Sequence, residues 1–452
     1  MPRDWTIREQ AQVIPELLEV VGGHSLVARL LAQSGISDAA AARAFLDPSY
    51  YTPSSPFALS GMQAAVDMIR KSIAQEVRIR IWGDFDADGQ TSTAVLYEAL
   101  RALGAKIDYR LPGRKEGHGL SMHAVDEAFE DGVGLLVTCD TGISENAAVE
   151  RAIALGLQVI ITDHHDLPEV IAPAHVVINP KMLPVNHPLH ELAGVGVAYM
   201  LARALLEGSE HAGILDEMLD LVVVGLVADM AVQVGEVRYL IQLGLAREAL
   251  RPGLRALMAV AGCTQISIDE ATLGYHIGPR LNAAGRLADA SLGVALLLAR
   301  DEAEAMGLAE QLEELNRDRQ ARTEALLAEA EELLQHDPAM LRKPAIILDG
   351  EGWEPGILGL VAGDLAERYG RPTILIAHLP DQPSAGSARS VAGIDIHEAI
   401  ASQRAYLVRE GGHPMAAGLG IERDRVPAFR DAIWGWLSGV RPQVKLGAPL
   451  VI

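Results

Sequence analysis

The chain contains little cysteine and has a deficit of positive charge. Its 452 residues include only two cysteines, Cys139 and Cys263, which excludes a disulfide framework and fits a reducing compartment. Lys and Arg number 38 against 60 Asp and Glu, which gives a formal net charge of −22. This charge argues against a surface that is basic overall, the usual mark of a nucleic-acid-binding protein.

Long apolar runs are also missing. No run approaches the roughly 18 residues that a membrane-spanning helix needs, and the nearest one, residues 219–232, is interrupted by Asp220 and Asp229. The N-terminus has no apolar signal core. We therefore expect a cytoplasmic protein that makes no membrane contact, and we expect it to be a monomer.

Apolar residues nevertheless make up 49% of the chain, enough for more than one core, and the length suggests two or three domains. Between about residues 78 and 179, short apolar runs alternate with segments of helical periodicity. This alternation predicts βαβ units and a parallel sheet covered by helices on both faces. The expected strands are residues 79–82, 107–109, 135–138, 159–162 and 176–178, and the clearest helices are residues 91–103 and 145–155.

The remainder of the chain predicts further helices and a second α/β unit. Residues 192–298 have mostly helical periodicity. Residues 301–334 hold 11 acids and three arginines, with leucines at helical spacing. We expect a long helix here, with one packed and one solvated face, that joins two domains and ends at His336-Asp337-Pro338. The second α/β unit follows at residues 344–437. Its expected features are strands at 345–348 and 373–376 and a glycine-rich element at 411–420.

Carboxylates and histidines follow several predicted strands and one helix. Asp84, Asp86 and Asp88 leave the first strand at a spacing of two, which places several oxygens on one side of the chain. The other positions are Asp140 after the third strand, Asp163-His164-His165 after the fourth, and Asp229 after the apolar run 221–227.

These motifs are expected to converge, because ligands of an open parallel sheet bind at the carboxyl ends of its strands. Taken alone, an Asp-x-Asp pair is more often a solvated turn, Asp140 a helix N-cap, and a His-His pair part of the surface or core. Together they favour a metal site, since crowded carboxylates repel one another without a cation. Mixed carboxylates and imidazoles suit Mn²⁺, or Mg²⁺ with lower preference, better than Ca²⁺ or structural zinc.

The order of these residues resembles the DHH phosphoesterase superfamily and, within it, the RecJ-like exonucleases that are specific for single strands. The resemblance covers about three quarters of the chain, residues 81–419. It also rests on further motifs at residues 117–121, 192–196, 278–286, 353–359, 386–390 and 411–413. One departure is Glu354, where the family usually has His after Trp353.

The resemblance implies an architecture of two α/β domains, a parallel-sheet DHH domain and a smaller DHH-associated domain, joined by a long helix with the active site in the groove between them. The implied divisions are an N-terminal helical region (1–60), the DHH catalytic domain (61–300), the connecting helix (301–338), the DHH-associated substrate-binding domain (339–440) and a tail (441–452). The C-terminal OB-fold that such proteins usually carry is expected to be absent.

The resemblance also implies two bound ions, Mn²⁺ or Mg²⁺. The implied catalytic metal ligands are Asp86, Asp88, Asp140, His164, His165 and Asp229. Asp84 would be a further or partial ligand, and Asp163 would orient the ligands. Substrate-binding positions would be Arg280, Asn282, Arg286, Ser387, Arg389, Gly411, Gly412 and His413. For Arg280 and Arg286, a structural ion pair is as good an interpretation as phosphate contact.

The leading functional hypothesis is a metal-dependent 5′→3′ exonuclease that hydrolyses single-stranded DNA in recombination and repair. One alternative is a phosphodiesterase for oligoribonucleotides or cyclic dinucleotides, and another is a non-catalytic nucleic-acid-binding scaffold. The expected partner is single-stranded DNA. Single-strand binding protein and a helicase are implied as partners by the resemblance alone.

Overall fold

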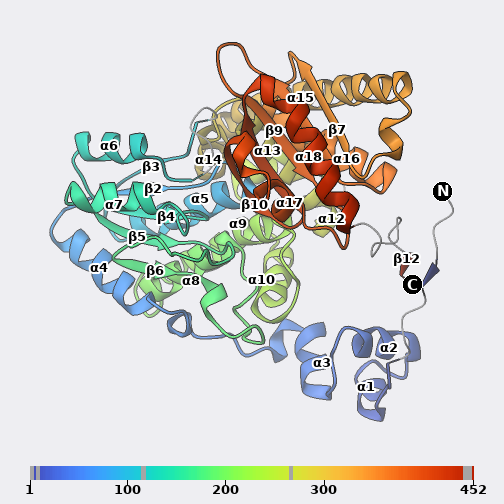
Figure 1. Cartoon of the computed structure of the whole chain (residues 1–452). Coiled ribbons are helices and arrows are strands. Elements are labelled where there is room, and N and C mark those ends of the chain that lie inside the picture. The colour runs from blue at the N-terminus through green and yellow to red at the C-terminus, as the bar shows by residue number, and fades with distance from the viewer. Residues whose placement is uncertain (1–4, 7–10, 114–118, 264–267, 441–449, 452) are drawn as a thin grey trace. The chain divides into compact units, whose positions relative to one another are not determined.

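The structure, a computed structural model, describes residues 5–6, 11–113, 119–263, 268–440 and 450–451 (Figure 1). The chain divides into two compact units. The first spans Ala11–Asn316, and the second consists of Met1–Gln10 with Arg317–Ile452. The division falls within α15 (Glu302–His336), the long helix expected from the acidic block. The expected tail, residues 441–452, lies outside the described residues except for 450–451.

The first unit begins with short helices that have a small core of their own. These elements are α1 (Pro15–Val20), α2 (Ser25–Gln33), α3 (Ala39–Leu46), η1 (Pro48–Tyr50) and η2 (Pro56–Ala58). Leu17, Ala28, Leu31 and Ala42 form their buried cluster. The chain then enters α4 (Met62–Ala74), which packs on the main core of the unit through Met62 and Ile69.

The main sheet of the first unit is entirely parallel, as predicted. Its strands are β2 (Arg78–Trp82), β3 (Lys106–Arg110), β4 (Val133–Cys139), β5 (Gln158–Thr162) and β6 (Val176–Ile178). Their order is β3-β2-β4-β5-β6. Each of the five predicted apolar runs lies in one of these strands. The parallel order places the ends of β2, β4 and β5 at the same edge of the sheet.

Helices cover both faces of this sheet, so its strands are buried on both sides. On one face, α6 (Met122–Glu130) and α7 (Asn146–Ala154) pack on Leu136, Val159 and Ile161. On the other face, α4, α5 (Ala87–Ala102) and α8 (Gly194–Leu206) pack on alternate residues of the same strands. Two apolar layers therefore hold the sheet and fix the edge from which the acidic loops leave.

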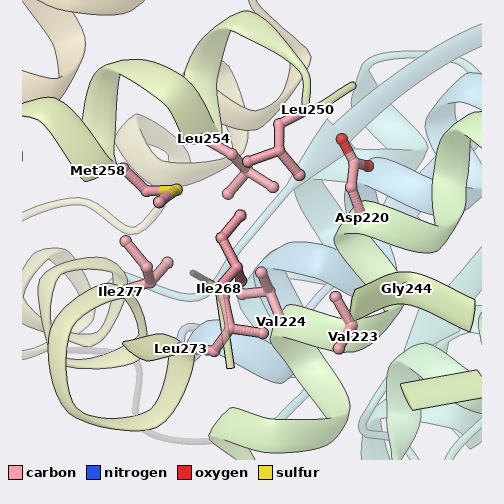
Figure 2. A pocket seen from close by; sticks show the side chains of 10 residues that line it. All are labelled: Asp220, Val223, Val224, Gly244, Leu250, Leu254, Met258, Ile268, Leu273 and Ile277. Atoms are coloured by element: carbon pink, nitrogen blue, oxygen red, sulfur yellow. The ribbon is translucent and has the colours of Figure 1, made fainter. Parts of the chain in front are cut away.

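The predicted helical region that follows α8 in the chain is also confirmed. It consists of α9 (Ile214–Ala228), α10 (Gly235–Leu245), α11 (Pro252–Val260), α12 (Glu270–Thr272), the π-helical turn η4 (Leu273–Ile277), α13 (Gly278–Leu287) and α14 (Ser291–Leu298). A cavity of about 10 Å³ lies between α9, α10, α11 and η4. Figure 2 shows that the side chains around it are apolar apart from Asp220. It is about the size of one water molecule and is too small for a ligand.

The second unit contains a mixed five-stranded sheet. Its strands are β7 (Ile346–Glu351), β8 (Thr373–His378), β9 (Ser384–Arg389), β10 (Leu407–His413) and β11 (Ala416–Ile421). Their order is β10-β11-β9-β8-β7, and only β7 and β8 are parallel to each other. The sheet packs against α16 (Pro355–Tyr369) through one core cluster, while α17 (Ile396–Ala401) and α18 (Val426–Val440) belong to another.

Shorter elements complete the structure. They are η3 (Pro180–Met182), η5 (Met340–Arg342), η6 (Arg404–Tyr406), η7 (Arg423–Arg425) and a parallel pair of two-residue strands, β1 (Trp5–Thr6) and β12 (Leu450–Val451). No helix in the described part of the chain combines the length and apolar character that crossing a membrane would require.

The sequence did not predict two local features of the structure. Helix α5 begins at Ala87, four residues before the expected start, because the Asp86 carboxylate caps it and accepts hydrogen bonds from the amides of Asp88 and Gly89. The glycine-rich element at 411–420, for which the sequence predicted no strands, is most of a β-hairpin formed by β10 and β11. Its backbone pairing needs no apolar alternation, which is why periodicity did not reveal it.

Candidate metal centre

The first acidic loop connects β2 to α5 and becomes the first turn of that helix. Asp86 is the N-cap residue, and its Oδ1 lies 3.0 Å from the amide nitrogens of both Asp88 and Gly89. Asp84 is 7% exposed. A Cβ on Gly89 would lie 2.4 Å from the carbonyl oxygen of Asp84, so the tight loop requires a glycine there.

Asp88 is anchored by the N-terminus of α8. Its side chain is 2% exposed, and its Oδ2 and Oδ1 accept hydrogen bonds from the amides of Gly194 (2.7 Å) and Val195 (2.8 Å). Both amides are among the donors that a helix leaves unsatisfied at its N-terminus, where negative charge is favoured. The motif at residues 192–196, to which sequence reasoning gave no role, therefore fixes a candidate ligand.

Asp140 follows β4 in a left-handed backbone conformation, with φ of +62°. Such a conformation is uncommon for a residue with a side chain, is tolerated better by Asp than by most residues, and recurs at functional sites. Gly194 packs directly on Asp140, since a Cβ at this glycine would lie 2.6 Å from the Asp140 Cβ. The neighbouring Cys139 is fully buried as the last residue of β4, as expected, and burial raises the pKa of its thiol.

The third motif follows β5 and separates into two kinds of residue. Asp163 is 1% exposed and accepts hydrogen bonds from the amides of Ile143 (2.9 Å) and His164 (2.7 Å). Its Oδ1 also lies 2.7 Å from His165 Nδ1. These donors occupy both carboxylate oxygens, so Asp163 orients the His165 ring and leaves Nε2 as the ring nitrogen for a ligand.

His164 lies at the centre of the cluster. Its Nε2 is 3.0 Å from Asp140 Oδ1 and 3.7 Å from Asp88 Oδ2, and its Nδ1 is 4.0 Å from Asp229 Oδ2. Asp229 comes from a helix, as the C-cap residue of α9. Gly225 brings that end of α9 close to the site, because a Cβ there would lie 2.9 Å from Asp88 Oδ1.

Three overlapping groups of these side chains could each hold a metal ion. Within each group, one potential ligand atom per residue lies within 4.8 Å of the others. The groups are Asp140, His164 and His165; Asp88, His164 and Asp229; and Asp84, Asp86 and Asp140. The structure therefore brings together all seven residues that the sequence predicted as ligands.

The charges in this cluster favour bound protons or a cation. Burial, and then the charge of a neighbouring carboxylate, raises the pKa of Asp88 and that of Asp229 to about 7. The same causes raise the pKa of Asp86, and raise that of Asp140 well above its usual value. Burial lowers the pKa of His164, which leaves a neutral imidazole suited to metal binding.

His165 and Asp163 behave as an ion pair within this cluster. Burial opposes the charge on each, but their hydrogen bond prevails: it raises the pKa of His165 to about 9 and lowers the pKa of Asp163. Asp140 Oδ1 is buried and, although His164 Nε2 lies 3.0 Å away, it accepts no hydrogen bond from the described residues. A buried carboxylate oxygen of this kind, among other carboxylates and imidazoles, fits a hard or borderline divalent cation such as Mg²⁺ or Mn²⁺.

The predicted substrate-binding residues of α13 make contacts within the first unit. The Nε of Arg280 lies 2.7 Å from Glu313 Oε2, and its guanidinium also donates to the carbonyl of His276. Of the two interpretations left open for Arg280, the structure thus shows the structural ion pair. Asn282 accepts a hydrogen bond from the amide of Ala87. Arg286 is half-buried near the end of the same helix.

The predicted substrate-binding residues of the second unit lie on β9 and on the β10–β11 hairpin. Arg389 donates to the carbonyl of Ala388 (2.8 Å) and to Ser387 Oγ (3.4 Å), and burial lowers its pKa. Among the described residues, no carboxylate forms an ion pair with it. Gly411, Gly412 and His413 are exposed at the end of β10.

Two further points concern Glu354 and the motif at residues 117–121. Glu354, which departs from the family pattern, forms an ion pair with Arg322 of α15 at 3.2 Å, so its charge is compensated within the second unit. The motif at residues 117–121 is described only from Gly119, because Gly117 and His118 lie outside the described residues.

Comparison with known proteins identifies the family. The model of the DHH family N-terminal domain matches residues 78–226, and that of the DHHA1 domain matches residues 342–439. The single-stranded-DNA-specific exonuclease RecJ of Escherichia coli (strain K12) is 39% identical over 84% of this chain and 70% of its own length. The chain belongs to the RecJ family.

Other RecJ proteins agree with this assignment. RecJ of Bacillus subtilis (strain 168) is 38% identical over 95% of this chain, which spans 54% of that relative. A crystal structure of exonuclease RecJ bound to manganese matches with a TM-score of 0.75 and 35% identity, over 87% of this chain and 99% of the other. RecJ of Thermus thermophilus in complex with Mn²⁺ matches with a TM-score of 0.81 and 31% identity, over 99% of this chain and 64% of the other.

Proposed function

We propose that the protein is a metal-dependent exonuclease that degrades single-stranded DNA from the 5′ end in recombination and repair. The observation that carries this proposal is the convergence of Asp88, Asp140, His164 and Asp229, from separate loops, within ligand distance of one another. Its RecJ relatives are named as exonucleases specific for single-stranded DNA.

We assign different roles to the residues that would bind the ions and to those that hold these ligands in place. The candidate ligands are Asp84, Asp86, Asp88, Asp140, His164, His165 and Asp229. Bound divalent ions would supply a deprotonated water at neutral pH and neutralise charge that develops on the phosphate. Asp163 holds the His165 ring in place, and the N-terminus of α8 holds Asp88. Cys139, the thiol next to a ligand, is buried and kept protonated, so we assign it no nucleophilic role.

Arg389 supports a phosphate-binding role for the second unit. A guanidinium matches phosphate geometry, and this one is largely buried without a carboxylate partner among the described residues. We propose that Arg389, with Ser387 beside it, binds the DNA backbone, and that the exposed Gly411, Gly412 and His413 contribute to the same surface. We also propose a cytoplasmic monomer, with single-strand binding protein and a helicase as partners on the family resemblance alone.

A comparison of substrates tests the proposed function. With Mn²⁺, we expect the protein to degrade a 5′-phosphorylated single strand of roughly 30 nucleotides faster than a dinucleotide, and to release mononucleotides from the labelled 5′ end first. A preference for the dinucleotide, or for a cyclic dinucleotide, would contradict the proposal in favour of a short-substrate phosphodiesterase. Hydrolysis of neither, with retained DNA binding, would indicate a scaffold.

A further inference from the structure

Helix α13 contacts the loop that carries the first three candidate ligands. The Oδ1 of Asn282 lies 2.7 Å from the amide nitrogen of Ala87, the first residue of α5, and accepts its hydrogen bond. The amides of the next two residues donate to Asp86. The first three amides of α5 are thus satisfied by two side chains, one of them almost 200 residues away in the sequence.

A second contact joins the same loop to the same helix. Gln90 is fully buried, and its Nε2 donates to the carbonyl of Phe85 (2.7 Å) and to the carbonyl of Leu281 (3.1 Å). The amide group therefore links the backbone of the acidic loop to the backbone of α13. Buried side-chain amides that bridge two main-chain carbonyls restrict the relative movement of both segments.

Two glycines allow these contacts to form. A Cβ on Gly285 would lie 2.4 Å from the carbonyl oxygen of Phe85, and a Cβ on Gly293 of α14 would lie 1.8 Å from Gln90 Oε1. Any larger residue at either position would push the loop or the bridging amide away. The contacts of Asn282, Gly285 and Gly293 are thus directed at residues 85–90, where Asp86 and Asp88 lie.

We infer that Asn282 is a positioning residue for the metal centre, which sets metal affinity by holding the N-terminus of α5, and is not a DNA ligand. The inference rests on the proposed function for the presence of the metal. Loss of the Asn282 acceptor would leave the buried Ala87 amide unsatisfied and free Asp86 and Asp88 to shift. Partners of this kind typically change metal affinity by about 10–100-fold when they are replaced.

Mn²⁺ binding to the full chain without DNA tests this role separately from catalysis. Isothermal titration or the electron paramagnetic resonance signal of free Mn²⁺ gives the affinity. We expect Asn282→Leu to weaken Mn²⁺ binding by about tenfold. Asn282→Asp keeps an oxygen acceptor at the same position and should retain most of the Mn²⁺ affinity of the parent protein. Asn186→Leu, in the exposed turn before α8, is the matched control and should bind Mn²⁺ like the parent protein.

The contrary outcomes are distinct. Unchanged Mn²⁺ affinity in Asn282→Leu, together with a raised KM for DNA at saturating Mn²⁺, would make Asn282 a substrate contact and overturn the inference while the proposed function stands. A parent chain that binds no Mn²⁺ would overturn both. If Asn282→Leu does not fold, Gly285→Ala tests whether α13 positions the same loop, through its packing on the carbonyl of Phe85, and parental Mn²⁺ affinity in that variant would also overturn the inference.

Discussion

His164 and Asp140 meet at the candidate metal centre with His164 Nε2 3.0 Å from Asp140 Oδ1, although they follow two different strands. The strands β4 and β5 are parallel neighbours, so both residues leave the sheet at the same edge. Burial and four neighbouring aspartates raise the pKa of Asp140 well above its usual value. This crowding of acids stabilises a bound cation at the expense of the metal-free fold.

Replacing Asp140 by Asn should reduce metal-dependent hydrolysis without destabilising the fold. Asn keeps the volume and tolerates the left-handed backbone that Asp140 adopts. Since it removes a charged ligand, we expect Mn²⁺-dependent hydrolysis to fall by more than about 100-fold, the upper end of the range for indirect partners. The melting temperature in EDTA should stay equal or rise, because one of several repelling carboxylates is gone. Unchanged turnover in Asp140→Asn, or in Asp140→Ala, would refute the metal assignment.

We expect substitution of Gly194 to impair Mn²⁺ binding, as substitution of a ligand would. A Cβ there would lie 2.6 Å from both Cβ and Oδ1 of Asp140. Gly194→Ala should therefore displace Asp140 or the start of α8, destabilise the protein by about 1–3 kcal/mol and reduce Mn²⁺ affinity. The control is Gly213→Ala before α9, where a Cβ would meet nothing within 4 Å. Thermal unfolding and Mn²⁺ titration of both variants check this, and equal behaviour of the two would contradict it.

Much of the fold could be predicted from the sequence because it follows from simple periodicity, while the ligand set was what the family resemblance implied. Apolar runs indicated the five parallel strands, and the parallel order brings Asp86, Asp140 and His164 to one edge. Asp229 was found by its sequence pattern, but it reaches the site from the end of α9. That approach depends on Gly225 packing against Asp88, a tertiary contact that no local pattern contains.

Contacts over long sequence separations could not be predicted from the sequence. Arg280 could have contacted phosphate or an acid, and its partner Glu313 lies 33 positions away on α15. The resemblance implied that Asn282 binds substrate, and in the structure its Oδ1 accepts a hydrogen bond from the amide of Ala87. Strand β9, with the sequence Ser-Ala-Gly-Ser-Ala-Arg, lacks the apolar alternation that marks a strand, so its sheet pairing was not predicted.

The stability of the metal-free protein should fall as the pH rises. Asp88 and Asp229 have a pKa of about 7 in the folded chain, against roughly 3.9 in an unfolded chain. Between these values the folded state binds more protons than the unfolded state, so the free energy of unfolding decreases with increasing pH. This contribution is complete below about pH 4 and is lost as the pH passes through 7.

Mn²⁺ should reverse this trend at the site, because it binds the deprotonated carboxylates. We expect the rise in melting temperature on adding Mn²⁺ to be larger at pH 8 than at pH 5.5, and Mn²⁺ binding at pH 6 to release protons. Thermal unfolding in EDTA and in Mn²⁺ across this range, with titration in buffers of different ionisation enthalpy, measures both. A stabilisation by Mn²⁺ that does not depend on pH would contradict the raised pKa values.

Replacing Arg389 should weaken DNA binding without affecting the metal centre. Its guanidinium is largely buried and has no carboxylate partner among the described residues, so holding the charge there costs stability. We expect Arg389→Met to leave the melting temperature equal or higher, to leave Mn²⁺ affinity unchanged and to raise the KM for single-stranded DNA by about tenfold, the loss of a charge-assisted hydrogen bond. Arg389→Lys keeps the charge but not the planar donor pair, so it should recover only part of the binding. A variant that loses stability, with an unchanged KM, would show that Arg389 supports the fold of β9 and does not bind phosphate.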